Sequence, residues 1–275
     1  GNDAATGSIV FDHYLAMSPG NVEGEIDGID TIEPAFGLPA KWIIADLREK
    51  AELLGYTVVD PSSVISTHLT EVIKKHAYEI MTREDVKQLI DNAKNTSPTL
   101  VEELIPGLMT MGDIQKVLSN LLREGISIRN LPMILEALAD YARSTRDINI
   151  LTEYTRQRLI KQISRQFFPF GHARVVTLDQ TLEGMLLDSI EHGDAGSCLA
   201  IDPITQQGLI QAIADEVRKL LQLGEQPIVV TAPIVRFYLK RMTEGVIPDL
   251  IVLSYNEIES TIDVQSAGMV KNNED

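Results

Sequence analysis

Three side chains between positions 68 and 76 are of types that bind metal ions. Glu71 and His76 follow His68 by three and eight positions, which places them roughly on one face of a helix. Two imidazoles and a carboxylate could hold a metal ion that activates water. The apolar spacing of this segment indicates an amphipathic helix, whose polar residues usually face solvent. We therefore expect a solvated helix face, with a metal-dependent hydrolase as the alternative.

Other reactive groups are isolated in the sequence. Cys198 is the only cysteine, which excludes a disulfide framework, and with no base nearby it is expected to be a small buried residue. The acidic stretch 23–33 lacks the regular spacing of a calcium loop. No phosphate-binding glycine motif, nucleophile elbow or zinc-protease motif is present. The sequence predicts no catalysis and no cofactor.

The segment Thr31–Pro39 indicates recognition rather than catalysis. Phe36 stands in a loop stiffened by Pro34 and Pro39, with Glu33 three residues before it. Such a loop can present an aromatic anchor beside a carboxylate, as interface hot spots commonly do. The alternative is that Phe36 fills the local core under Trp42.

Composition restricts the class of protein. The 275 residues contain 24 Lys and Arg against 40 Asp and Glu, for a formal net charge of -16. This balance argues against nucleic-acid binding, because phosphate affinity requires clustered basic residues. Residues 1–40 contain seven acidic residues and no basic one. No charge-free apolar run approaches the roughly 20 residues of a membrane span, and the first residues do not resemble a signal peptide.

The elements fall into three blocks. Residues 1–80 predict an α+β unit, with a strand over 7–11, a helix from Pro39 to Leu54, a strand over 56–59 and a helix over 61–80. Residues 81–160 predict capped helices, with capping boxes at Thr82 and Thr110 and a long last helix from about 148 to 167. Residues 161–275 return to α/β. The predicted fold class is α+β, with small α+β lobes, a helical middle domain and a C-terminal α/β domain.

Several short motifs occur together in the order and spacing of one known family. They are Phe36-Gly37-Leu38-Pro39-Ala40 with Trp42-Ile43, Gly55-Tyr56-Thr57-Val58-Val59, Thr67-His68-Leu69, Leu104-Ile105-Pro106-Gly107, Val117-Leu118-x-Asn120-Leu121-Leu122 and Ile128-Arg129-Asn130. Together they resemble the FlhA/SctV (FHIPEP) family of type III secretion export-gate proteins, and its flagellar branch in particular. The likeness extends over essentially the whole chain.

The resemblance implies a cytosolic region at the inner face of the bacterial plasma membrane, anchored by an N-terminal membrane domain upstream of Gly1. It implies a homo-nonameric ring and four subdomains. On this sequence these would be a truncated first subdomain (1–11 and 61–80), an inserted second (12–60), a helical third (81–160) and an α/β fourth (161–275).

The resemblance also implies a docking site. In flagellar members a hydrophobic dimple between the first two subdomains receives export chaperones loaded with late substrates. The matching residues here are Glu33, Phe36, Val59, Val64 and Thr67, with Ile29 as a looser candidate. The expected function is a non-enzymatic docking platform whose partners are these chaperones, other export-apparatus proteins and further copies of the chain. The alternative from a different class is a structural ring component that binds no substrate.

Overall fold

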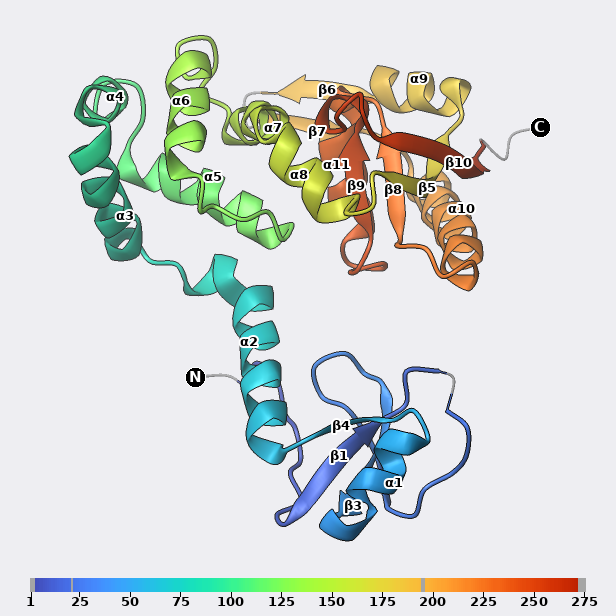
Figure 1. Cartoon of the computed structure of the whole chain (residues 1–275). Helices are drawn as coiled ribbons and strands as arrows, with labels where there is room; N and C mark the ends of the chain where they lie inside the picture. The colour runs from blue at the N-terminus through green and yellow to red at the C-terminus, as the bar shows by residue number, and fades with distance from the viewer. Residues whose placement is uncertain (1–2, 21, 194–195, 272–275) are drawn as a thin grey trace. The chain divides into compact units, whose positions relative to one another are not determined.

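The computed structural model describes residues 3–20, 22–193 and 196–271, and the chain divides into two compact units (Figure 1). The first unit comprises residues 1–80 and the second residues 81–275. The structure confirms the predicted α+β class. The finer division into four subdomains stays a prediction. Among the described residues, no helix is both long and apolar enough to cross a membrane.

The first unit is built on an antiparallel sheet with the strand order β2-β3-β1-β4. Its elements are β1 (His13–Met17), β2 (Ile29–Ile32), β3 (Pro39–Ile44), η1 (Ala45–Leu47), α1 (Arg48–Leu53), β4 (Thr57–Val59) and α2 (Pro61–Ile80). Side chains of successive strand residues point to opposite faces. Accordingly Leu15 and Trp42 pack under Val64 of α2, while Ala16 and Ile43 pack with Ala51 of α1.

Two sequence predictions for this unit are wrong. Residues 7–11 form no strand, and β1 begins only at His13. Residues 39–44 form β3 instead of the first turns of a helix, because they pair with β1 on one side and β2 on the other. Proline suits the first residue of a strand as well as the first turn of a helix, so Pro39 could not decide between them.

The second unit combines a helical bundle with a parallel sheet of order β10-β5-β8-β9. The bundle contains α3 (Arg83–Thr96), α4 (Pro98–Leu104), α5 (Met111–Arg123), α6 (Leu131–Tyr141), α7 (Ile148–Arg158) and α8 (Ile160–Phe167). The α/β part contains β5 (His172–Leu178), α9 (Gln180–Asp188), β6 (Ile190–Gly193), β7 (Gly196–Leu199), α10 (Pro203–Gln222), β8 (Ile228–Thr231), α11 (Pro233–Thr243), β9 (Ile251–Ser254), η2 (Tyr255–Glu257) and β10 (Asp263–Val270).

Each face of the parallel sheet has its own core. Val175 and Val230 face the helical bundle and belong to the same apolar cluster as α5 and α6. Val176 and Val229 face the other way, toward α9, α10 and α11. Bundle and sheet therefore share a continuous core within the second compact unit.

Helix boundaries in the bundle follow the predicted caps with one exception. Both capping boxes are present, at Thr82 with Asp85 and at Thr110 with Asp113. The predicted single helix from about 148 to 167 is instead two helices, α7 and α8. Leu159 separates them with a ψ of 15° while its side chain is buried in the bundle core.

Candidate functional site

A row of apolar side chains crosses the sheet of the first unit on the face that α2 covers. Directly paired residues of antiparallel strands project to the same face. Ile29 pairs with Trp42, Trp42 with Leu15, and Leu15 with Val59. Val64 of α2 packs on this row and is nearly fully buried. The fold therefore brings three predicted site residues, Ile29, Val59 and Val64, to one side of the sheet.

This row ends at an open edge. Ile29 lies on β2, the edge strand of the sheet, and remains 54% exposed, whereas Val59 is half-buried and Val64 is covered. Thr67 lies on α2 almost one turn beyond Val64, with its side chain in solvent. An apolar floor with an exposed rim can bury the side chains of a partner.

Residues 33–38, here called the Phe36 hairpin, connect β2 to β3. Phe36 is 62% exposed, so the alternative that it fills the core under Trp42 is wrong. The backbone closes tightly, since the Glu33 N–H donates to the Leu38 carbonyl at 2.8 Å and the Gly37 N–H to the Glu33 carbonyl at 3.0 Å. Gly37 has a φ of +70°, which a residue with a side chain rarely adopts. The hairpin therefore exposes the Phe36 ring to solvent.

Glu33 lies inside this hairpin and is only 3% exposed. Its carboxylate accepts hydrogen bonds from the Ala35 N–H at 2.9 Å and from the Phe36 N–H at 2.6 Å. The sequence predicted a carboxylate presented beside the aromatic anchor of the docking site. In this structure the acid is beneath the aromatic residue, with both oxygens bonded to the backbone.

A groove of ≈ 460 Å³ runs along α2 within the first unit. The N-terminal segment from Asp3 to Ile9 forms one wall, and α2 residues including Val64 and Leu69 form another. Pro34 of the Phe36 hairpin also lines it. The groove therefore joins the hairpin to the apolar side of α2, on which Ile65, Leu69 and Ile73 are at least half exposed.

The side chains of the metal-site alternative do not converge. Glu71 forms an ion pair with Lys74 at 2.7 Å, and His76 lies 3.2 Å from Glu79. Within the described ranges, no three His, Cys, Asp or Glu side chains are grouped to hold a metal ion. The geometry gives no support to the hydrolase alternative. Cys198 of β7 is exposed, which contradicts the expected burial.

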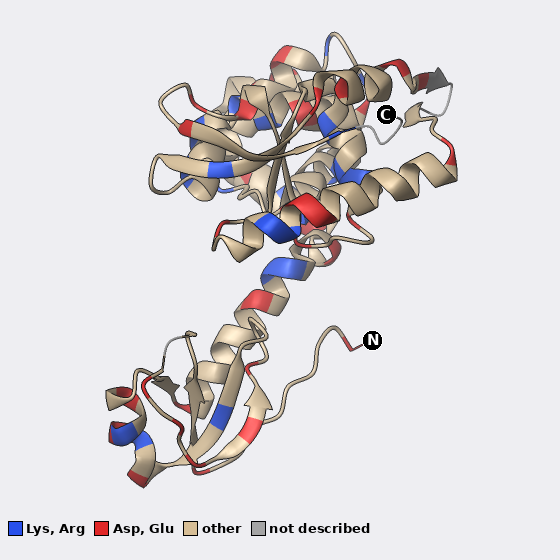
Figure 2. Ribbon diagram, turned by 90° about the vertical axis from the view of Figure 1, so that its right-hand side faces the viewer, with Lys and Arg blue, Asp and Glu red and all other residues tan. Residues whose placement is uncertain are grey.

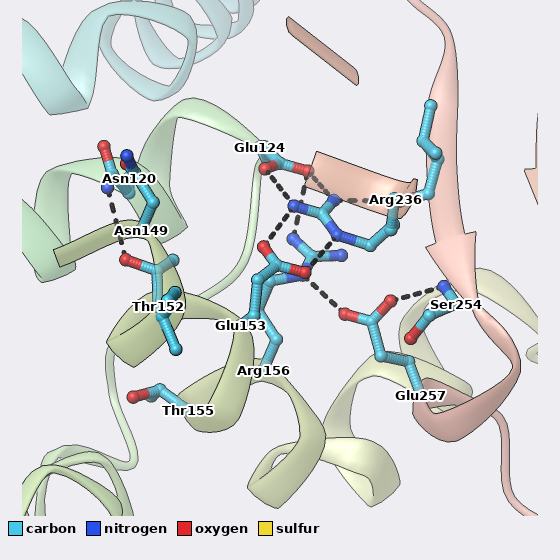
Figure 3. A network of polar contacts seen from close by, with 12 residues as sticks. Asn120, Glu124, Asn149, Thr152, Glu153, Thr155, Arg156, Arg236, Ser254 and Glu257 are labelled. Atoms are coloured by element: carbon cyan, nitrogen blue, oxygen red, sulfur yellow. Dashed lines mark hydrogen bonds and ion pairs between the residues drawn. The ribbon is translucent and has the colours of Figure 1, made fainter. Parts of the chain in front are cut away.

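A buried charge network lies in the second unit, where the helical bundle meets the parallel sheet (Figure 3). Arg236 of α11 binds Glu124 through both terminal nitrogens, at 2.6 and 3.0 Å, and Glu153 of α7 through Nε at 2.6 Å. Arg156 of α7 binds Glu124 at 3.1 Å and Glu257 of η2 at 2.5 Å. Five charged side chains from four segments thus satisfy one another in the interior.

The environment shifts the proton affinities of this network. Burial alone would raise the pKa of Glu124, but Arg156 and Arg236 outweigh it and hold the pKa at about 2. Burial raises the pKa of Glu153 despite its contact with Arg236. The same burial lowers the pKa of Lys240, which donates to the Leu250 carbonyl at 2.6 Å. The contacts indicate a structural clamp between bundle and sheet.

The order of residues alone does not predict this network, although it contains one signal of it. Arg236 follows Val235 and precedes Leu239 on the buried face of α11, and Arg156 lies beside buried Thr155 on α7. A charge on the apolar face of a helix requires a buried partner. The signal identifies the arginines but not their glutamates, which come from distant parts of the chain.

The second unit also has an apolar pocket of ≈ 370 Å³ between α7 and α11. Its lining includes Ile150, Tyr154, Ile234 and Phe237, and Glu153 of the charge network lies at its wall. Such a pocket can receive apolar side chains.

Comparison with known proteins identifies the class. The model of the FHIPEP family matches residues 1–263, so the chain belongs to the FHIPEP family. The family resemblance drawn from the sequence is therefore confirmed.

The similar curated proteins are flagellar biosynthesis proteins named FlhA. That of Bacillus subtilis is 48% identical over 271 residues, which are 98% of this chain and 40% of the relative. That of Borreliella burgdorferi is 38% identical over 265 residues, which are 96% of this chain and 38% of the relative. The chain spans about two-fifths of the length of these relatives.

Solved structures share the fold. The Chlamydia pneumoniae CdsV protein superposes with a TM-score of 0.85 at 29% identity, over 97% of this chain and 77% of CdsV. The nonameric EPEC SctV-C superposes with a TM-score of 0.75 at 24% identity, over 96% of this chain and 79% of that one. The latter likeness concerns the fold alone.

Proposed function

We propose that this chain is a non-enzymatic docking platform of the bacterial flagellar type III export gate. It binds export chaperones loaded with late substrates and orders their delivery to the membrane channel. The observation that carries this proposal is the Phe36 hairpin, which exposes an aromatic ring and whose Pro34 lines the groove along α2. Support comes also from the family and from the flagellar relatives.

The proposed docking surface comprises Phe36, the edge residue Ile29, the floor residues Val59 and Val64, and the exposed Thr67. A partner helix would place an apolar face against the floor and the Phe36 ring. An anchor of this kind loses about 2 kcal/mol or more when truncated, or about 30-fold in affinity.

Charge near this surface favours basic partners. Glu23, Glu25 and Asp27 are exposed on the loop that leads into β2, and Figure 2 shows acidic residues along the loops of the first unit. Within the described residues, none of the three forms an ion pair. Exposed charges act mainly on encounter rate and orientation, and salt screens them beyond about 8 Å.

The assembly belongs to the proposal as well. It comprises a homo-nonameric ring at the cytoplasmic face of the inner membrane, and SctV-C, which shares this fold, is nonameric. A solved complex of CdsV with CdsO supports binding of another export-apparatus protein. A membrane anchor is part of the proposal too, since this chain spans only 40% of the Bacillus subtilis relative.

Calorimetric titration of the chain with a flagellar export chaperone bound to its late substrate tests the proposal. We expect Phe36→Ala to weaken binding about 30-fold. Phe170→Ala is the matched control, because Phe170 is also an exposed phenylalanine, 82% against 62% for Phe36, and lies in the second unit. Equal binding by wild type and Phe36→Ala would move the docking site elsewhere. Absence of binding by the folded wild type would favour the purely structural ring component.

A further inference from the structure

Glu33 is the buried centre of the Phe36 hairpin. Four hydrogen bonds of the hairpin involve this residue, two to its carboxylate and two to its own backbone N–H and carbonyl. Its two carboxylate oxygens are each used by a different N–H, from Ala35 and Phe36. In the described part of the chain no cation pairs with it.

The bond to the Phe36 N–H constrains the residue that presents the ring. Phe36 is largely exposed, so packing does little to fix it. A backbone residue that is disordered before binding loses conformational entropy when it is ordered, and binding must supply the free energy for that loss. A hairpin held by Glu33 is ordered before the partner arrives.

We propose that Glu33 is a positioning residue that sets the orientation of Phe36, and that the partner contacts the ring and not the carboxylate. This inference rests on the proposed docking function of the Phe36 hairpin. Glu33 is then a fixed part of the scaffold rather than a charge that meets the partner.

The chain contains a close precedent for this arrangement. Asp202 precedes Pro203 at the start of α10, and its Oδ1 accepts from the N–H groups two and three residues ahead, both at 3.0 Å. Glu33 precedes Pro34 and bonds the N–H groups at the same two offsets. Aspartate is one methylene shorter than glutamate, and at position 202 a single oxygen of its side chain accepts both hydrogen bonds. An Asn at position 33 has that oxygen without a charge, whereas a Gln replaces one of the two oxygens by a donor.

Substitutions of Glu33 by these side chains therefore distinguish a positioning role of the residue from a role of its charge. Exchange of the Phe36 amide proton with deuterium, measured by NMR on the chain alone, reports how well the hairpin is ordered in the absence of a partner. Titration with the chaperone–substrate complex reports docking. We expect Glu33→Asp and Glu33→Asn to keep the slow exchange and to bind like wild type, within about threefold. Glu33→Gln and Glu33→Ala should exchange faster and bind about tenfold more weakly.

The opposite pattern would overturn the inference. If Asn and Gln at position 33 both weaken binding while the Phe36 amide stays slow, Glu33 acts as a charge toward the partner. Fluorescence of Trp42, the only tryptophan, checks that each variant is folded. Phe36→Ala in the same titration distinguishes the two proposals. If that variant binds like wild type, the docking function at this hairpin fails, whereas the exchange data still decide whether Glu33 orders it.

Discussion

At the scale of residues, two largely buried glutamates of the charge network, Glu124 and Glu153, have pKa values shifted in opposite directions. Arg156 and Arg236 keep Glu124 ionised to a pKa of about 2, whereas the pKa of Glu153 is raised by its burial. A carboxyl whose pKa is lowered by folding stabilises the protein above its unfolded pKa. That contribution disappears as the pH falls toward the folded pKa.

We therefore predict that Glu124→Gln destabilises the second unit more at pH 7 than at pH 3. At pH 7 the variant leaves two buried arginines short of a carboxylate, for which about 3–5 kcal/mol is typical. At pH 3 the unfolded wild type is mostly protonated at this position, so less stabilisation remains to lose. Urea unfolding followed by circular dichroism measures both values. An equal loss at the two pH values would contradict the assigned ionisation of Glu124.

At the scale of elements, α5 illustrates a helix whose start is determined locally. The Thr110 hydroxyl accepts from the Asp113 N–H at 3.2 Å and donates to its carboxylate at 2.7 Å. The same hydroxyl lowers the pKa of Asp113. Four residues of this helix, Ile114, Val117, Leu118 and Leu121, are buried in the bundle core. The cap therefore stabilises the first turn of a helix that contributes to the core of the second unit.

Removal of this cap should cost about 1 kcal/mol, as is typical of Thr→Ala at a helix N-cap. We expect Thr110→Ala to lower the urea midpoint of the second unit without changing the slope of the transition. Thr110→Ser keeps the hydroxyl and serves as the control. A loss of the same size in both variants would assign the effect to the methyl group instead of the cap.

At the scale of the whole molecule, the chain has two compact units with separate cores. Trp42, the only tryptophan, lies in the core of the first unit, while most helices belong to the second. Tryptophan fluorescence and circular dichroism at 222 nm therefore report mainly on different units. Such a chain need not unfold in a single transition.

We predict that Leu118→Ala lowers the helical transition and leaves the fluorescence transition unchanged. Leu118 is fully buried in the bundle core, where Leu→Ala typically costs about 2–5 kcal/mol. Ile204→Ala, at an exposed position of α10, is the control and should change neither transition by more than about 0.5 kcal/mol. Equal shifts of both signals after Leu118→Ala would show that the two units unfold together.

The predictable part of the candidate site is the part that depends on residues close together in the sequence. The motif around Phe36 indicated an aromatic anchor in a stiff loop, and the family resemblance assigned residues around it. The direction of the ring and the burial of Glu33 depend on hydrogen bonds that close the hairpin between β2 and β3. Spacing along the chain carries no information on which oxygen meets which N–H.

By itself the sequence determined the features that depend on near neighbours: the caps of α3 and α5, the α+β class and the family motifs. Only the tertiary structure decided that residues 39–44 form a central strand, because their partners β1 and β2 lie on both sides. It alone joined Arg156 to Glu124 and Glu257, and Arg236 to Glu124 and Glu153, across positions far apart in the sequence. Local propensity is readable from residue order, whereas pairing across the fold is decided by which surfaces meet when the chain packs.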